Sequence, residues 1–81
     1  MSCHIIESKN LVGETVHDMY TLMVYGGIEY FDRHIMVYRR EKWLTCEKKR
    51  YPILSELGRT ILMENMVPID VLWDHYNKEG N

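Results

Sequence analysis

The stretch "YTLMVYGGIEYF", residues 20–31, places two adjacent glycines between two runs rich in β-forming residues. Glycine adopts positive φ at low cost, and both central residues of a type I′ turn need positive φ. The twist of that turn suits paired antiparallel strands, so the stretch predicts a two-residue hairpin at Gly26-Gly27. In this register the facing pairs are Tyr25 with Ile28, Met23 with Tyr30 and Leu22 with Phe31.

A helix over residues 16–25 is the competing interpretation of the same stretch. Thr15 followed three residues later by Asp18 fits a helical capping box, and Gly26 fits a helix C-terminal stop. Four apolar side chains would also share one helical face: Val16, Met19, Tyr20 and Met23. We favour the hairpin because residues 20–25 are rich in β-formers and a similar run follows the glycines.

A second hairpin is predicted from "HIMVYRREKWLTCE", residues 34–47, in which "RREK" would form a four-residue loop between two apolar runs. If Tyr38 pairs with Trp43, alternation sends successive side chains to opposite faces of the sheet. One face would carry Ile35, Val37, Leu44 and Cys46, and the other Met36, Tyr38, Trp43 and Thr45. The first face is aliphatic and is the better candidate for the core.

Beyond Pro52 the apolar spacing becomes helical. Ile53, Leu54, Leu57 and Ile61 would share one side of a first helix, with Gly58 as a weak point. Pro68 can start a second short helix, in which Ile69, Leu72, Trp73 and Tyr76 recur at helical spacing. The sequence therefore predicts an α+β fold: a small antiparallel β-meander of about four strands followed by two short C-terminal helices.

The chain has 81 residues, of which 46% are hydrophobic, so we expect one folded domain over residues 1–81, with 77–81 as a frayed tail. No stretch approaches the roughly 20 apolar residues that span a bilayer, and no targeting segment is evident, so we expect a soluble, cytoplasmic protein without membrane contact. Two cysteines, Cys3 and Cys46, are too few for a disulfide scaffold and are read as reduced thiols. Homodimer formation would help to stabilise so small a core.

Charge is unevenly distributed along the chain. Residues 33–50 contain seven Lys or Arg against Glu41 and Glu47, a net charge of +5, whereas the remainder has three bases against ten acids, a net charge of −7. The sequence thus predicts a dipolar molecule. Charged hairpins are common on sheet edges, where they discourage pairing with another chain, so edge protection alone could explain the basic segment.

The functional interpretation is that the basic segment is a binding surface with flat aromatic rings among cations. The candidate contact residues are Arg33, Tyr38, Arg39, Arg40, Lys42, Trp43, Lys48, Lys49 and Arg50. Such a surface suits an acidic protein partner, or a nucleic-acid backbone with an unstacked base. Ten acids elsewhere and a sequence pI near 6.0 would oppose a long polyanion, so a protein partner is favoured over nucleic acid.

The acidic side of the chain offers a second candidate surface, with Glu56, Glu64, Asp70 and Asp74 in the predicted C-terminal helices. Signatures of chemistry are weak. No His or Cys pair has the spacing of metal ligands, and no phosphate loop is present. Cys46 on a predicted core face and Cys3 in a terminal segment do not suggest a thiol activated by a base, so no metal site, cofactor or catalytic residue is predicted. So short a chain also has little room for an enzyme pocket of ~300 Å³ besides its core.

These observations predict a small non-enzymatic protein-binding module. It would act as a regulator or inhibitor by occupying a surface of a partner protein through residues 33–50, a role that compact single-domain modules often have, sometimes in viruses and mobile elements. The alternative is a nucleic-acid-binding protein that uses the same basic aromatic segment.

Overall fold

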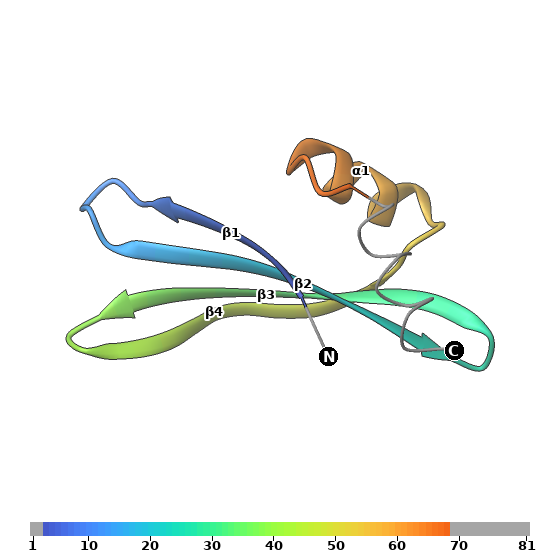
Figure 1. Cartoon of the computed structure of the whole chain (residues 1–81), viewed down its shortest axis with the longest axis horizontal. Helices are drawn as coiled ribbons and strands as arrows, with labels where there is room; N and C mark the ends of the chain where they lie inside the picture. The colour runs from blue at the N-terminus through green and yellow to red at the C-terminus, as the bar shows by residue number, and fades with distance from the viewer. Residues whose placement is uncertain (1–2, 69–81) are drawn as a thin grey trace.

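A twisted four-stranded antiparallel sheet with the order β1-β2-β3-β4 forms the body of the structure, a computed structural model that describes residues 3–68 (Figure 1). The strands are β1 (His4–Lys9), β2 (Thr15–Tyr25), β3 (Ile28–Arg39) and β4 (Lys42–Pro52), and the helix α1 (Glu56–Glu64) lies over one end of the sheet. No helix within residues 3–68 has the length and apolar character needed to cross a bilayer.

The hairpin predicted at Gly26-Gly27 joins β2 to β3. Gly26 and Gly27 have φ of 56° and 79°, as a two-residue type I′ turn requires. All three predicted pairs, from Tyr25–Ile28 to Leu22–Phe31, occur in the register. The competing helix over residues 16–25 is wrong, because these residues form an unbroken strand that pairs with β3 along its whole length and with β1 as far as Tyr20.

The second predicted hairpin is present, but its loop is shorter than expected. Tyr38 pairs with Trp43 as predicted, and the strands continue to a pair between Arg39 and Lys42. Only Arg40 and Glu41 remain in the turn, so the predicted four-residue loop is wrong. Both residues have positive φ, 52° and 64°, without being glycine.

A β-bulge removes Cys46 from the predicted alternation of β4. The register shifts between Ile35 and Met36, whose partners are Glu47 and Thr45, so Cys46 is the extra residue on β4. Cys46 is exposed, and of the predicted aliphatic face only Val37 is buried. Ile35 and Val37 alternate onto the same side of β3 as Phe31, so the predicted face is on the core side of the sheet. It is not the main core, because the buried cluster lies at the other end, where α1 covers the sheet (Figure 1).

The four strands are divided differently from the expectation. The predicted runs at 28–31 and 35–38 belong to one continuous strand, β3, because the polar residues between them pair on both sides. β1 was not predicted, since its alternation is weak and most of its side chains are exposed. It is held by pairing with β2, from His4–Tyr20 to Lys9–Thr15.

Helix α1 lies in the predicted stretch but buries a different face. It begins after Ser55, whose hydroxyl accepts a hydrogen bond from the backbone N–H of Gly58 at 3.0 Å. Because the helix starts at Glu56, Leu54 and Leu57 point to solvent, whereas Ile61 and Leu62 are buried.

A left-handed residue ends the helix. Met66 has φ of 55°, the N–H of Val67 donates to the carbonyl of Leu62 at 2.8 Å, and Val67 is buried. This is the Schellman arrangement, in which glycine usually takes the position of Met66. The chain therefore turns back toward the core after one short helix.

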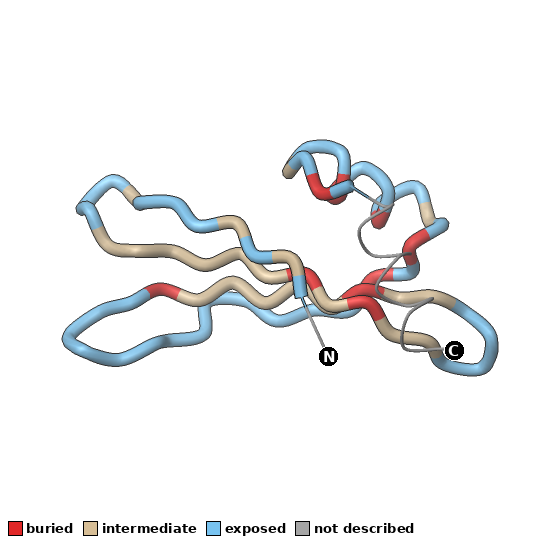
Figure 2. Tube along the Cα trace, in the orientation of Figure 1, coloured by how far each residue is buried: buried red, intermediate tan, exposed pale blue. Residues whose placement is uncertain are grey.

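The core is concentrated at the α1 end of the sheet (Figure 2). Its buried cluster consists of Tyr20, Leu22, Phe31, Tyr51, Ile53, Ile61, Leu62 and Val67. Phe31 lies between two other rings, with centroids 5.9 Å from Tyr20 and 5.3 Å from Tyr51. The opposite end of the sheet has no helix over it within the described residues.

The predicted α+β class with two C-terminal helices is wrong. The structure is mostly β, with the single helix α1 among the described residues, because the sheet takes up most of residues 4–52. The second predicted helix, from Ile69 to Tyr76, and the predicted tail 77–81 lie outside the described residues.

Candidate functional site

Three of the nine candidate contact residues are engaged in ion pairs within the sheet. Each is an arginine that donates two hydrogen bonds to one carboxylate: Arg33 to Asp18, Arg39 to Glu14 and Arg50 to Asp32. The acids come from outside residues 33–50, so the charge separation of the sequence is partly cancelled in space. These arginines hold neighbouring strands together, and paired guanidinium groups offer less charge to a partner.

Asp18 is the centre of the most buried of these pairs. Its side chain is 14% exposed and that of Arg33 is 19% exposed, with nitrogen–oxygen distances of 2.9 and 3.1 Å. Tyr20, which is fully buried, donates its phenol O–H to the same carboxylate at 2.8 Å. Burial, and then this hydrogen bond, raises the pKa of Tyr20, and the hydrogen bonds to Asp18 raise the pKa of Arg33.

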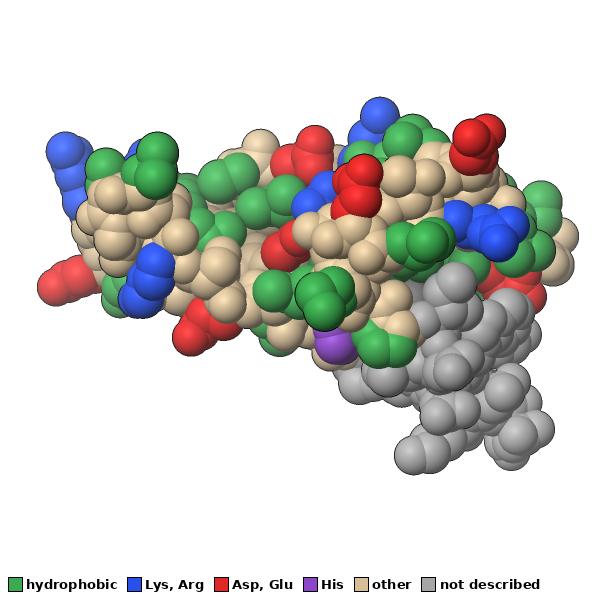
Figure 3. All heavy atoms as spheres, turned by 90° about the horizontal axis from the view of Figure 1, so that it is seen from above, with side chains coloured by type: hydrophobic (Ala, Val, Ile, Leu, Met, Phe, Trp, Pro, Cys, Tyr) green, Lys and Arg blue, Asp and Glu red, His purple; other side chains and the backbone are tan. Residues whose placement is uncertain are grey.

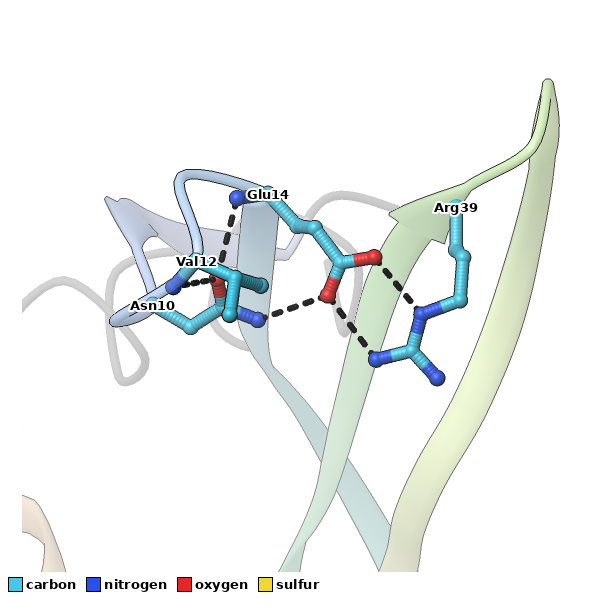
Figure 4. Close-up of polar contacts among 4 residues, drawn as sticks. All are labelled: Asn10, Val12, Glu14 and Arg39. Atoms are coloured by element: carbon cyan, nitrogen blue, oxygen red, sulfur yellow. Dashed lines mark hydrogen bonds and ion pairs between the residues drawn. The ribbon is translucent and has the colours of Figure 1, made fainter.

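Glu14 links the β1–β2 turn (residues 10–14) to the β3–β4 turn at the end of the sheet away from α1 (Figure 4). Its carboxylate accepts from Arg39 Nε at 2.6 Å and Nη2 at 2.8 Å, and from the Asn10 side-chain amide at 2.9 Å. Asn10 in turn accepts from the backbone N–H groups of Val12 and Glu14. The hydrogen bonds from Arg39, followed by that from Asn10, lower the pKa of Glu14 from 4.5 to about 2.

This lowered pKa predicts a loss of stability in acid. A carboxyl group whose pKa falls on folding contributes stability above its unfolded pKa of 4.5, and that contribution is lost as the pH falls toward about 2. We expect the difference in free energy of unfolding between the native chain and the Glu14→Gln variant to be constant near neutral pH. It should shrink as the pH falls from 4.5 to about 2. Chemical denaturation over that range is the measurement, and a difference independent of pH would contradict the assignment.

Four candidate cations have no ion pair with a described residue: Arg40, Lys42, Lys48 and Lys49. All four lie on the β3–β4 hairpin and all are exposed. Lys49 places its ammonium 5.5 Å from the centroid of the Tyr51 ring. These four residues, rather than the whole predicted set, carry the charge that the hairpin presents to solvent.

Position on the edge strand accounts for part of this charge. β4 is the edge strand of the sheet. The N–H of Ile53 donates to the carbonyl of Glu29, and hydrogen-bonded and non-hydrogen-bonded pairs alternate along an antiparallel ladder. The backbone N–H and C=O groups of Lys48 and Arg50 therefore point away from β3. Lysines, a bulge and Pro52, which lacks an N–H, are the features with which proteins prevent pairing at a free edge. Edge protection therefore explains Lys48 and Lys49 without a partner, and it also opposes β4–β4 pairing in a homodimer.

The aromatic candidates lie on the opposite face from the neighbouring cations. Alternation and register place Tyr38 and Trp43 on one face of the sheet, and Arg39 and Lys42 on the other. Trp43 contacts the Tyr38 ring, with centroids 5.1 Å apart, and the His17 ring at 4.4 Å. The predicted arrangement of rings with cations directly around them is therefore not formed.

The remaining features converge on the end of the hairpin, which we call the β3–β4 tip (residues 38–44). On one face Arg39, Arg40, Lys42 and Leu44 line an open hollow of about 480 Å³. On the other face Tyr38 and Trp43 remain 42% and 40% exposed. The tip thus presents two cations without an ion pair to a described residue, Arg40 and Lys42, with Glu41 between them and apolar surface beside them.

The β1–β2 turn was not predicted; in it Leu11 and Val12 are exposed and Asn10 and Glu14 hold the backbone. The Asn-x-x-Gly-Glu pattern of residues 10–14 was the available signal, because Asn followed by Gly is typical of turns. Of the acidic candidates, Glu56 and Glu64 lie at opposite ends of α1, and Asp70 and Asp74 lie outside the described residues.

Within residues 3–68, no three His, Cys, Asp or Glu side chains are grouped so that they could hold a metal ion. Cys3 and Cys46 are both free and exposed. Comparisons with protein families, with curated proteins and with solved structures found no match for this chain. Functional inference therefore depends on the geometry of the tip.

Proposed function

We propose that this chain is a small non-enzymatic protein-binding module that acts as a regulator or inhibitor of its partner. The contact is the β3–β4 tip, whose Arg40 and Lys42 meet an acidic surface of the partner protein. Leu44 on the same face supplies apolar contact area, and Arg, Tyr and Trp are the residue types that dominate binding energy at protein interfaces.

The observation that carries the proposal is the conformation of Arg40 and Glu41. Another two-residue turn with positive φ at both positions joins β2 to β3, and it uses Gly26 and Gly27. A residue with a Cβ in the left-handed region costs about 1–2 kcal/mol more than glycine there. Strain of this kind is concentrated at functional positions, where a side chain is kept despite its cost. Edge protection does not require Arg at the turn itself.

An acidic protein surface fits the tip better than nucleic acid does. Two unpaired cations at one protruding end suit a local contact, whereas a polynucleotide would also meet carboxylates elsewhere on a chain of net charge −2. Nucleic acid remains the alternative ligand because Tyr38 and Trp43 are both exposed and lie on the face of the sheet that also carries Lys48.

The experiment is to replace the strained turn with a relaxed one, using the double variant Arg40→Asn/Glu41→Gly. Asn-Gly is the preferred type I′ sequence, so we expect the free energy of unfolding to rise by about 1–2 kcal/mol. The affinity for the partner captured from a source lysate should nevertheless fall at least tenfold, or about 1.4 kcal/mol. Because the variant is more stable, unfolding cannot explain the lost binding.

Two controls separate the contributions. Glu41→Gly alone keeps the Arg40 cation, so it should be more stable and still bind. The double variant Lys48→Ser/Lys49→Ser removes two edge cations and should bind as the native chain does. Capture should persist after nuclease treatment, and native affinity in the Asn-Gly variant, or capture that depends on nucleic acid, would contradict the proposal.

A further inference from the structure

The β1–β2 turn presents two aliphatic side chains to solvent on a well-defined backbone. Leu11 is fully exposed and Val12 is 78% exposed. Asn10 fixes the turn through its hydrogen bonds to Val12 and Glu14, and Gly13 N–H donates to the Asn10 carbonyl at 3.0 Å. Two apolar side chains are therefore exposed to water on a turn whose backbone is fixed by hydrogen bonds. Such a preorganised apolar surface is typical of a binding interface.

This turn lies at the same end of the sheet as the β3–β4 tip (Figure 1). The pair Glu14–Arg39 continues the β2–β3 register by two residues beyond Val16–Val37, so it joins the two turns directly. Seen from the α1 side, the end of the molecule away from α1 shows Lys and Arg side chains beside hydrophobic ones (Figure 3). Aliphatic and cationic side chains thus share one end of the protein.

Glu14 also orients one wall of the hollow. It binds Arg39 through Nε and Nη2, which leaves Nη1 pointing away from the carboxylate (Figure 4). Arg40 and Lys42 line the same hollow, with Leu44 as its apolar part. Several donors around a hollow with one aliphatic wall suit a carboxylate carried on a short side chain.

We infer that the β1–β2 turn and the β3–β4 tip form one bipartite docking surface, fixed by Glu14–Arg39, for an acidic segment of a partner protein that also carries aliphatic side chains. The segment places an Asp or Glu carboxylate in the hollow and packs aliphatic groups against Leu11 and Val12. Charge complementarity selects this occupant, since Arg40 and Lys42, which line the hollow and pair with no acid among residues 3–68, are positive. The inference rests on the proposed function and adds the second turn and the chemistry of the partner.

The test uses peptides of defined composition, so it does not need the natural partner. The first probe is a pool of peptides of about 12 residues, long enough when extended to span both turns, made from Asp, Glu, Leu, Val and Ser. A second pool replaces the acids with Lys and Arg, and a third probe is oligothymidylate of similar length. We expect the acidic pool alone to bind, with amide NMR shifts at residues 11–14 and 40–44 together.

Two variants test the two halves of the surface. Leu11→Ser/Val12→Ser removes only exposed side chains, so its thermal midpoint should stay near the native one while its affinity for the acidic pool falls at least tenfold. The matched control, Leu54→Ser/Leu57→Ser, removes two exposed leucines at the α1 end and should bind normally. In Glu14→Gln the coupling is broken, and shifts should be confined to one of the two turns.

The outcomes distinguish this inference from the proposed function. If the acidic pool binds Leu11→Ser/Val12→Ser as tightly as the native chain while Arg40→Asn/Glu41→Gly loses binding, the bipartite surface is wrong and the proposed function stands. If no peptide pool binds, the inference about the partner's chemistry is wrong. Preferential binding of oligothymidylate at residues 38–44 would overturn both.

Discussion

Substituting Gly58 with alanine is expected to destabilise this protein by about 1–3 kcal/mol, although the same change in an ordinary helix stabilises by about 1 kcal/mol. A Cβ on Gly58 would overlap the carbonyl oxygen of Pro52 and lie 2.9 Å from the Ser55 hydroxyl. The oxygen belongs to the backbone and cannot rotate away, so α1 must shift. The shift would loosen the Ser55 cap and withdraw Ile61 and Leu62 from the core.

Urea denaturation of Gly58→Ala measures this effect. Thr60→Ala is the matched control, since Thr60 is exposed on the same helix and alanine is the better helix former there. The control should be as stable as the native chain or slightly more so. Equal or greater stability of Gly58→Ala would mean that α1 does not sit on the Pro52 turn as described.

Substituting Asp18 with alanine is expected to lower the free energy of unfolding by about 2–3 kcal/mol. The change removes the acceptor of the buried Tyr20 hydroxyl and the only ion pair of Arg33 among the described residues. Both groups are then left with their polar atoms unpaired in a largely buried position, which costs more than the native pair contributes.

Two comparisons identify the cause. Asp18→Asn keeps an oxygen that can accept from Tyr20 but loses the charge opposite Arg33, so its loss should be smaller. Asp32→Ala removes the Arg50 pair, in which the arginine is 45% exposed, and should cost less than about 1 kcal/mol. Equal losses at Asp18 and Asp32 would contradict the special role of the buried cluster.

The turns of this fold could be predicted from sequence to different degrees. Gly26-Gly27 has a strong local signal, because both glycines are needed at positive φ, and its register is confirmed. The Arg40–Glu41 turn has no such signal, since its conformation is imposed by the pairing of long strands rather than by local preference. The bulge at Cys46 likewise depends on pairing, so simple alternation could not place Cys46.

A shift of a few residues in where the helix begins changes which of its side chains are buried. Periodicity over residues 53–61 found the helical stretch, but Ser55 starts the helix after Ile53, so Leu54 and Leu57 are exposed. Gly58 was interpreted as a weak point, whereas the structure uses it for close approach to Pro52. Neither the exposure of Leu54 and Leu57 nor the approach of Gly58 to Pro52 can be predicted from residue spacing, because both depend on how the chain leaves β4.

For the candidate site, the sequence identified the basic hairpin but not its internal pairing. Three of its arginines form ion pairs with carboxylates that lie outside residues 33–50 in the sequence: Arg33, Arg39 and Arg50. A count of charge along the sequence cannot show these pairs. The second turn was missed because Leu11 and Val12 have no charged or aromatic signature. Their importance appears only when Glu14 is seen beside Arg39.

The central claim is that the β3–β4 tip is the part of this protein that a partner covers. Amide hydrogen exchange of the chain, alone and in complex with the captured partner, tests that claim most directly. We predict slower exchange in the complex at residues 38–44, together with residues 10–14, and unchanged exchange at 46–52 and in α1. Protection confined to the β4 edge or to α1, with the tip exchanging as in the free chain, would contradict the claim.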